Sequence, residues 1–431
     1  MRSTIAPALF LSLSGLASAQ GHVLVVDAAG GAPFTQIGPA LQAAAPGDVL
    51  LVRGGTYAPF AVANRSVTIA GEHGSLVQVS GTIQVRNLAA GRTVLLHGLH
   101  TSGASSSSAN DGPGITLKND AGPVRVQACL AQGAAGFPGV RVQGSGDVAV
   151  SSSQAFGGVG WEFSGSGIVA DGTAIAIYGC ALIGADGAPP WSYTPPGCRG
   201  GSAGSGVRCW TDGFLFCGGS FLQGGSGQNG INGCYGGPVY GDMAHGGSAG
   251  DGLDLRNGQQ TLWQFDDVFQ IGTPGWGGSG QCGCGLVANC DGDPGLPGVQ
   301  VHSSAGDLIT TLPGSSAVLA TSANPARELT TLGITMNSGP GESVLLVACS
   351  ATAFAPEANR GVRLVDSNGS HLTQRIGTTD AQGHLAYSWP IPDLGPGIES
   401  QVLHLQALVV SPGGTRRWSN PVALVLLDSA F

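Results

Sequence analysis

The sequence predicts an all-β protein in two parts: a long coil of short parallel strands, three to each turn, and then a smaller antiparallel β-sandwich. Three observations favour this fold class. Glycine supplies 75 of the 431 residues and 42% of the chain is hydrophobic, a composition that disfavours both helices and wholesale disorder. Six ten-residue segments share one pattern of apolar residues. Longer alternating runs replace that pattern from about Leu308.

Residues 1–19 have the pattern of an export signal. Arg2 precedes an apolar run from Ile5 to Ala17, and Ala17-Ser18-Ala19 is a small-x-small site of the kind that signal peptidases cleave. We therefore expect a secreted or cell-surface protein. The sequence has no later apolar run of about 18 residues, so no membrane span is predicted.

The charge of the chain bears on its partners. Without Arg2 the 17 basic residues become 16, against 26 acidic residues, so the mature chain would carry a formal net charge of −10. Binding to nucleic acid needs clustered lysine and arginine, and Lys118 is the only lysine of this chain. We therefore expect no nucleic-acid partner.

The repeated segments each begin apolar, any residue, apolar, then have two turn-like residues, a Leu, Cys, Ser or Val at the sixth position, and glycine at the tenth. They are Val94–Gly103, Val124–Gly133, Val148–Gly157, Ile175–Gly184, Leu215–Gly224 and Trp263–Gly272. We interpret each as strand, bend and strand. A third short strand precedes each one, at Ile83–Val85, Ile115–Leu117, Val140–Val142, Ile168–Ala170, Val207–Cys209 and Leu253–Leu255, and Val299–Val301 would start another turn. Stacked period-2 alternation of this kind predicts a parallel β-solenoid.

These repeats resemble the right-handed parallel β-helix, or pectate-lyase-like, family over about Gly21 to His302. The segment from Phe34 to Val49 and the Gly55-Thr56-Tyr57 turn also resemble that family. The resemblance implies a right-handed parallel β-helix at residues 20–307, with a short N-terminal helix that caps the open end of the coil. A cap is needed because an open end exposes apolar side chains and strand edges.

The C-terminal third predicts a β-sandwich at residues 329–431, after a linker at 308–328. Its alternating runs are Leu332–Thr335, Ser343–Val347, Gly361–Val365, His384–Trp389, Gln401–Val410 and Asn420–Leu427. The closing pattern of Leu405–Val410 with Trp418-Ser419-Asn420-Pro421 resembles C-terminal domains of secreted planctomycete-type proteins. This resemblance implies an accessory or surface-attachment role on a bacterial cell.

A binding face is predicted on one side of the coil. The outward middle residues of successive first strands are Thr116, Arg141, Val169, Arg208, Asp254 and Gln300. Rungs are about 4.8 Å apart, so Arg208 should lie beside Asp254, with Trp210 and Arg256 close by. The long inserts after Gly184, Gly224 and Gly272 should form a rim at one corner, which carries His245 and Trp276.

Such a binding face suits an extended sugar chain. Aromatic rings stack on the faces of pyranose sugars, while Arg and Asp side chains form hydrogen bonds to sugar hydroxyls or carboxylates. The predicted partner is therefore an extracellular polysaccharide or a cell-surface glycan, bound by Arg208, Trp210, Arg256, His245 and Trp276. The alternative is a solvated Arg-Asp ladder with no ligand.

Catalysis at the same face would depend on carboxylates. Asp212, Asp251 and Asp254 could supply the pair that glycoside hydrolysis needs, with Arg208 or His245 as a base for β-elimination. The sequence lacks the Asn-Thr-Asp, Asp-Asp and Gly-His-Gly set of polygalacturonase-like enzymes and the paired-Asp calcium site of pectate lyases. The function favoured is therefore a non-catalytic structural or polysaccharide-binding protein. The alternative is a polysaccharide lyase or glycoside hydrolase acting on an extracellular polysaccharide, such as a uronic-acid polymer.

Metal and cysteine chemistry is weakly indicated. Asp291 and Asp293 have the spacing of a Ca²⁺ loop without its other ligands, so Ca²⁺ stays an option and no other cofactor is predicted. The rim inserts contain Cys198, Cys234, Cys282, Cys284 and Cys290, for which disulfides are expected in an oxidising compartment. The remaining cysteines are predicted to fill the core: Cys129, Cys180, Cys209, Cys217 and Cys349.

Overall fold

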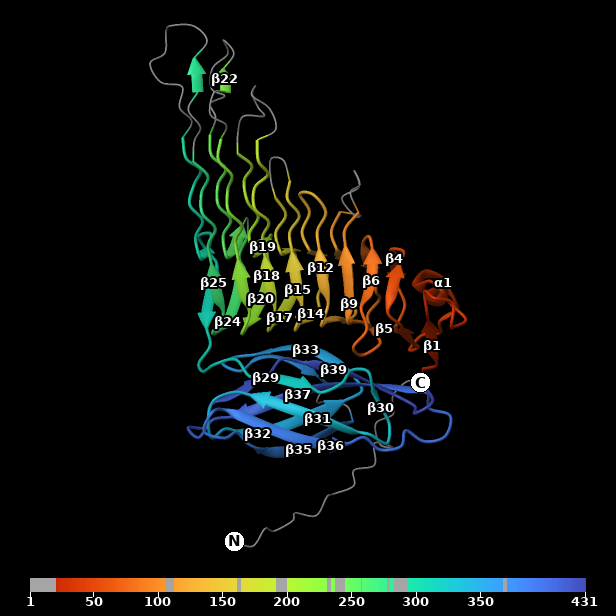
Figure 1. Cartoon of the computed structure of the whole chain (residues 1–431). Helices are drawn as coiled ribbons and strands as arrows, with labels where there is room; N and C mark the ends of the chain where they lie inside the picture. The colour runs from red at the N-terminus through yellow and green to blue at the C-terminus, as the bar shows by residue number, and fades with distance from the viewer. Residues whose placement is uncertain are drawn as a thin grey trace.

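A computed structural model describes residues 21–104, 112–160, 164–190, 200–230, 234–236, 245–256, 258–276, 280–282, 293–366 and 370–431. Within this part the chain forms a coil of parallel strands that lies beside a block of antiparallel strands (Figure 1). The predicted signal peptide, residues 1–19, is outside the described residues. None of the described helices is long and apolar enough to cross a bilayer.

Three parallel sheets run along the coil, and successive strands of the chain enter the three sheets in turn. The ten-stranded sheet contains β1 (Val23–Val26), β2 (Val49–Val52), β5 (Val67–Gly71), β8 (Val94–His97), β11 (Val124–Gln127), β14 (Val148–Ser151), β17 (Ala174–Tyr178), β20 (Gly213–Gly218), β24 (Gln260–Phe265) and β28 (Leu308–Thr311). Val124 pairs with Val148, Val148 with Ile175 and Ile175 with Leu215. The predicted parallel β-helix is therefore confirmed.

The two other sheets of the coil have eight strands each. One, called here the open sheet, contains β4 (Phe60–Ala63), β7 (Ile83–Arg86), β10 (Ile115–Lys118), β13 (Val140–Gln143), β16 (Ile168–Asp171), β19 (Val207–Trp210), β23 (Leu253–Arg256) and β27 (Val301–His302). The other contains β3 (Gly55–Tyr57), β6 (Val77–Ser80), β9 (Leu99–Ser102), β12 (Leu130–Gln132), β15 (Gln154–Phe156), β18 (Ala181–Ile183), β21 (Phe221–Gln223) and β25 (Val268–Gln270). Inward residues of all three sheets share one core along the coil.

The register of the last turn differs from the prediction. Leu215 pairs with Leu262 and not with Trp263, because Leu262 is fully buried in the core whereas Trp263 packs outside it, edge-on against Phe214. The sixth repeat therefore begins one residue earlier than predicted, at Leu262. Its sixth position is occupied by Asp267, where Val268 was expected.

The open sheet departs from its predicted register at the same turn. Leu253 pairs with Val301, so Asp254 pairs with His302 and not with Gln300. Val301 packs against the core of the coil, whereas Val299 is 45% exposed. Burial of the valine that fits the core thus sets the register.

The first end of the coil is covered by the helix α1 (Ile37–Ala43). Its apolar side, formed by Ile37, Ala40 and Leu41, is buried in the core of the coil. Arg65 donates from its guanidinium to the carbonyl oxygens of Leu41 and Ala44 at the end of this helix. The helix therefore closes the core at the end where β1 and β2 begin.

Glycine-rich segments leave the coil at one corner and stack on one another. Gly225 donates its N–H to the Gly204 oxygen at 2.9 Å, and Gly250 donates to Gly225 at 2.8 Å. A Cβ at Gly272 would lie only 1.7 Å from the carbonyl oxygen of Gly225, so only glycine allows this approach. The short strands β22 (Cys234–Gly236) and β26 (Gly280–Cys282) pair farther along these segments. The predicted rim is thus an ordered stack in its described part.

The C-terminal third is antiparallel, as predicted, apart from one two-residue parallel pairing of Ala326 and Arg327 with Leu426 and Leu427. Its strands are β29 (Val318–Thr321), β30 (Ala326–Arg327), β31 (Thr331–Asn337), β32 (Ser343–Cys349), β33 (Thr352–Glu357), β34 (Gly361–Val365), β35 (His371–Thr378), β36 (His384–Pro390), β37 (Ser400–Val410), β38 (Arg416–Trp418) and β39 (Val422–Leu427). They form a three-stranded and a six-stranded sheet that enclose a second core, and a two-stranded β33–β34 hairpin. The segment predicted as a linker, 308–328, contains β28, β29 and β30, because β28 completes the ten-stranded sheet.

The sandwich covers the outer face of the ten-stranded sheet. Two apolar clusters join the two parts of the chain, one containing Leu95 and Val425 and the other Tyr178 and Val362. The Tyr178 hydroxyl donates to the Val362 oxygen at 2.8 Å, and the Ala423 N–H donates to the Gln127 side-chain oxygen at 2.7 Å. Strands of this sheet are consequently buried on both faces.

Five cysteines are free and buried, as predicted: Cys129, Cys180, Cys209, Cys217 and Cys349. Burial raises the pKa of Cys129 to about 11 and the pKa values of Cys180 and Cys209 to about 12. These groups therefore remain thiols and act as small apolar residues. The other cysteines lie outside the described side chains, so disulfides among them stay a prediction: Cys198, Cys234, Cys282, Cys284 and Cys290.

Candidate functional site

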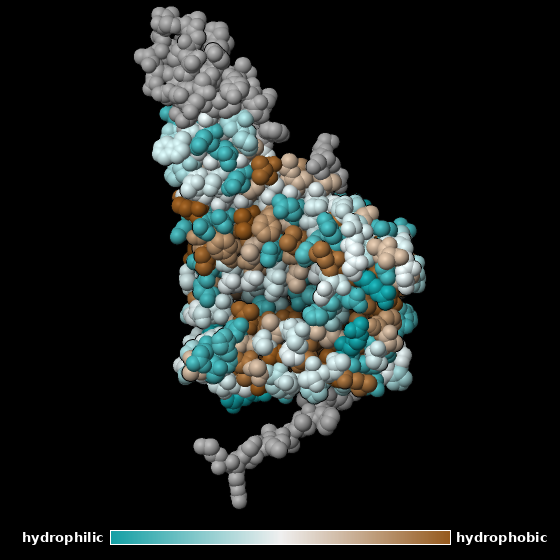
Figure 2. All heavy atoms as spheres, viewed as in Figure 1, coloured by the Kyte–Doolittle hydropathy of each residue, from teal (hydrophilic) through white to brown (hydrophobic). Residues whose placement is uncertain are grey.

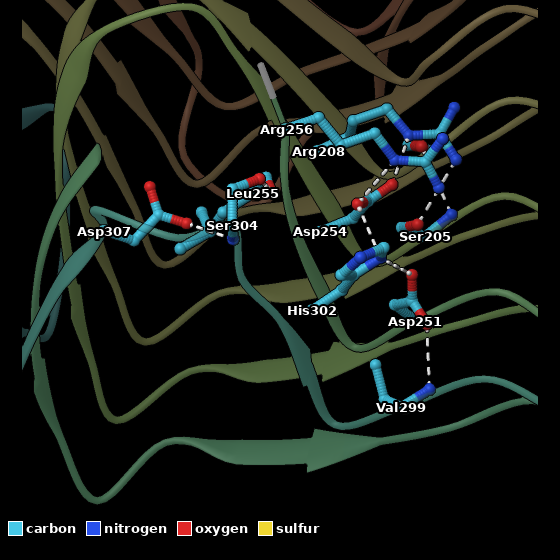
Figure 3. A network of polar contacts seen from close by, with 11 residues as sticks. Ser205, Arg208, Asp251, Asp254, Leu255, Arg256, Val299, His302, Ser304 and Asp307 are labelled. Atoms are coloured by element: carbon cyan, nitrogen blue, oxygen red, sulfur yellow. Dashed lines mark hydrogen bonds and ion pairs between the residues drawn. The ribbon is translucent and has the colours of Figure 1, made fainter. Parts of the chain in front are cut away.

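A cluster of charged side chains is centred on Asp254 in β23. Its Oδ2 lies 2.9 Å from Arg208 Nε and its Oδ1 lies 2.7 Å from Arg256 Nε. His302 Nδ1 is 3.5 Å from the same Oδ1. Asp254 itself has no exposed surface, because these three side chains lie over and around it (Figure 3).

The stacking of the open sheet brings these residues together. Arg208 of β19 pairs with Asp254 of β23, which pairs with His302 of β27, so the three side chains form one outward column. Trp210 and Arg256 form the neighbouring column. The predicted adjacency of Arg208 and Asp254 is therefore confirmed, and it follows directly from the parallel register.

A second carboxylate extends the cluster. Asp251 is 8% exposed and lies just before β23. Its Oδ1 accepts the Val299 N–H at 2.8 Å, and its Oδ2 lies 3.6 Å from His302 Nδ1. The imidazole of His302 thus lies between the two carboxylates. We call Arg208, Asp251, Asp254, Arg256 and His302 the Asp254 cluster.

The exposed part of the Asp254 cluster consists of arginine and histidine side chains, with the ring of Trp210 beside them. The side chains of Arg208, Arg256 and His302 are 21%, 40% and 49% exposed, whereas the Asp254 side chain is fully buried. Arg208 also donates to Ser205 Oγ at 3.4 Å and lies 5.9 Å from the ring centre of Trp210. A ligand on this face would therefore meet N–H groups and rings before it met a carboxylate.

Three of the predicted site residues lie apart from the cluster. Asp212 is exposed in the turn after β19, where its Oδ1 accepts the Gln259 N–H at 2.7 Å. His245 lies in the glycine-rich stack, and its Nδ1 accepts the Asp293 N–H at 3.0 Å. Trp276 is 74% exposed in the same stack. Asp212 therefore stabilises a turn, and it has no contact with the carboxylates of the cluster among the described residues.

His302 is the member of the cluster that sequence reasoning missed. The prediction took Val299–Val301 as the last first-sheet strand, which placed Gln300 beside Asp254. The available signal was the residue type: a histidine one position after an apolar residue fits a column of charged side chains better than Gln300 does.

Asp251, Asp254 and His302 offer ligand atoms within 4.8 Å of one another, a spacing compatible with a metal ion. Both oxygens of Asp254 already face guanidinium nitrogens, and two adjacent positive charges disfavour a divalent cation. The contacts are therefore those of an ion-pair network. Of the predicted Ca²⁺ fragment, Asp291 is outside the described residues.

The cluster lies on an open face. A cavity lined by Trp210 and Gln260 has no room for a water molecule. A second cavity, of about 10 Å³, lies between the coil and the sandwich, lined by Arg125 and His404 among others. Neither of these two cavities is lined by a residue of the Asp254 cluster.

No protein family and no curated protein matches this sequence. Among solved structures, the chain is similar to a pectin methylesterase from Aspergillus niger, with 13% identity over 58% of this chain and 86% of that chain and a TM-score of 0.30. It is also similar to the receptor-binding domain of the siphovirus 9NA tailspike, with 11% identity over 94% of this chain and 98% of that chain and a TM-score of 0.17. Similarities at this level do not bear on the activity of the chain.

Proposed function

We propose that this chain is an extracellular, non-catalytic polysaccharide-binding protein and that the Asp254 cluster, with Trp210, binds an acidic polysaccharide. The observation that carries the proposal is the arrangement of the side chains: partly exposed Arg256, Arg208 and His302 lie above a carboxylate with no exposed surface. An anionic sugar chain complements such a face because guanidinium groups bind carboxylates through paired N–H donors.

The buried carboxylate serves this function by holding the two arginines in place. Arg208 and Arg256 both contact Asp254 through Nε, so the rest of each guanidinium faces away from that carboxylate. Fixed side chains lose little conformational entropy when a ligand binds. The half-buried ring of Trp210, in the column of Arg256, would add a stacking surface for a sugar.

Hydrolysis or elimination is the second candidate because Asp251 and Asp254 approach within 4.8 Å. A glycosidase needs both carboxylates to flank the scissile bond. Asp254 is fully buried and paired with two arginines, so it cannot approach a substrate carbon. The burial of Asp254 therefore favours binding over catalysis.

The test is binding to polygalacturonate, alginate and a neutral glucan, measured by calorimetry. We expect the acidic polymers to bind, with an affinity that falls as salt rises. Arg256→Gln should weaken binding at least about tenfold, which corresponds to about 1.4 kcal/mol. Arg86→Gln is the matched control, because Arg86 is exposed in the same column of the open sheet, several rungs away.

Three outcomes would contradict the proposal. One is the absence of binding to every acidic polymer, and another is equal loss of binding in Arg256→Gln and Arg86→Gln. The third is release of unsaturated or reducing ends that Asp251→Asn abolishes, which would establish the catalytic alternative.

Export is a separate part of the proposal and rests on residues 1–19. N-terminal sequencing of protein recovered from the medium of an expressing bacterium should give Gln20 as the first residue. Retention of Met1 would contradict it without affecting the binding test.

A further inference from the structure

We propose that the chain forms a two-fold symmetric dimer through the last turn of its coil. That turn consists of β25, β27 and β28, the final strand of each of the three parallel sheets. His302 of β27 also belongs to the Asp254 cluster, so this surface adjoins the cluster. The inference rests on strand edges and apolar side chains and does not depend on the proposed function.

The last turn presents three unprotected strand edges. In each sheet the final strand pairs on one side only among the described strands. Soluble proteins usually protect such edges with charged residues, proline or a bulge. These strands read Val-Phe-Gln, Val-His and Leu-Ile-Thr-Thr, with no lysine, arginine, carboxylate or proline.

The same turn exposes side chains that are buried elsewhere along the coil. Ile309 continues the inward column of Leu262, yet Ile309 is 41% exposed whereas Leu262 is fully buried. Leu308 and Val268, on the same turn, are 59% and 56% exposed. Figure 2 shows apolar surface at the left edge of the coil, where Figure 1 places β25. Exposed apolar surface beside open edges indicates an interaction site.

The opposite end of the coil determines which partner fits. There α1 covers the core, and Ile37 is fully buried beneath it. Figure 1 places α1 and β25 at the two ends of the coil. Head-to-tail stacking is blocked by the helix, so only two uncapped ends can meet, and contact between like ends gives a closed two-fold dimer.

A second copy fits this end better than a peptide does. A single extended peptide can pair with one strand edge. It would leave the other two edges exposed, together with the end of the core at Ile309. The end of another coil has the same three-sided cross-section, so it can cover all three edges at once. The three strands contain no lysine, arginine, aspartate or glutamate, which limits repulsion between identical surfaces.

Sedimentation equilibrium of the full chain between about 1 and about 100 μM tests the dimer. We expect the wild-type chain to be dimeric in this range. Ile309→Lys should weaken association at least about tenfold, because it places a charge in the apolar contact. Leu308→Lys should act in the same way at a site that is already exposed, so the fold is kept. Leu76→Lys is the matched control, because Leu76 is 57% exposed in the turn before β6.

The proposal is overturned if the wild-type chain is monomeric throughout this range. It is also overturned if Leu308→Lys and Ile309→Lys both leave the dimer intact, or if Leu76→Lys disrupts it equally. A circular dichroism spectrum of each variant establishes that it is folded, and Leu308→Lys decides the result if Ile309→Lys does not fold.

Discussion

Two faces of the same coil have different environments. Along the ten-stranded sheet, strands such as Val94–His97 and Val148–Ser151 are buried at every residue, because the sandwich covers their outer side. In the open sheet, Val140–Gln143 alternates buried and half-buried residues. The inner packing is the same in both sheets, so the C-terminal third of the chain determines which outer face remains free for a ligand.

Arginines on the two faces have correspondingly different contacts. Arg125 of the ten-stranded sheet has a side chain only 5% exposed, 2.6 Å from Asp147 and hydrogen-bonded to Thr352 of the sandwich. Arg256 of the open sheet is 40% exposed. Outward arginines of one coil can therefore join two parts of the chain or remain available to a ligand, depending on what covers the sheet.

The largest expected effect is the loss of the covered arginine. Arg125→Ala should lower the free energy of unfolding by about 3–5 kcal/mol, because it removes the partner of the buried Oδ1 of Asp147 and the bonds of Arg125 to Thr352 and Ala353 of the sandwich. Arg208→Ala, on the open face, should lower it less, by about 2 kcal/mol, which corresponds to one hydrogen bond to a charged group, because Asp254 is still paired with Arg256. Equilibrium unfolding in urea measures both values. Equal losses would show that the two faces do not differ in the way proposed.

The sequence predicted the inward packing of the coil well because each rung repeats the same local pattern. Val124, Val148, Ile175 and Leu215 were expected to stack, and they pair residue for residue. The displacement in the last turn could not be predicted from the repeat alone. Trp263 and Leu262 both fit an apolar position, and only the covered outer face makes an outward tryptophan favourable.

The position of the sandwich on the coil was not predicted, although the sequence contains a signal for it. Strands of the ten-stranded sheet read as continuous apolar runs, for example Val-Leu-Leu at Val94–Leu96, which is typical of strands buried on both faces. Leu95 in this run packs in one apolar cluster with Val425, which is 425 − 95 = 330 residues away in sequence, so no local pattern identifies the partner. The Asp254 cluster was predicted except for His302, whose place depends on the register of a two-residue strand.

The covered face should also be sensitive to acid. His404, in β37 of the sandwich, is buried near Arg125 of the coil, and burial lowers the pKa of its imidazole to about 3. Since its unfolded pKa is about 6.5, the unfolded chain binds the proton first and stability falls as pH falls from 6.5 towards 3. The free energy of unfolding should be about 3 kcal/mol lower at pH 4 than at pH 7 from this group.

His404→Gln isolates this contribution, because glutamine stays neutral across the range. We expect its free energy of unfolding to change less between pH 7 and pH 4 than that of the wild-type chain. His73→Gln is the control, since His73 is exposed in a turn of the coil. An identical acid response in wild type and His404→Gln would exclude His404 as a cause.

The smallest expected effect has the opposite pH dependence and arises inside the coil. Asp267 accepts the Ser220 N–H at 2.7 Å through Oδ1, whereas its buried Oδ2 has no hydrogen-bond partner among the described residues. Burial raises the pKa of this carboxyl group to about 8, so the folded chain holds the proton more tightly than the unfolded chain. Stability should therefore fall as pH rises from about 4 to about 8.

Asp267→Asn keeps the acceptor for Ser220 and removes the charge. At pH 9 it should raise the free energy of unfolding by about 2 kcal/mol, less than the full pKa shift because Asp267 is half-buried and solvent relaxes around its charge. At pH 5 the variant and the wild-type chain should be nearly equal. Asp266→Asn is a suitable comparison, because Asp266 is exposed and bonds Ser316. If Asp267→Asn raised the free energy of unfolding equally at pH 5 and pH 9, the cause would be packing at this position and not the ionisation of Asp267. The interior of the coil would then not have the pH dependence opposite to that of the covered face.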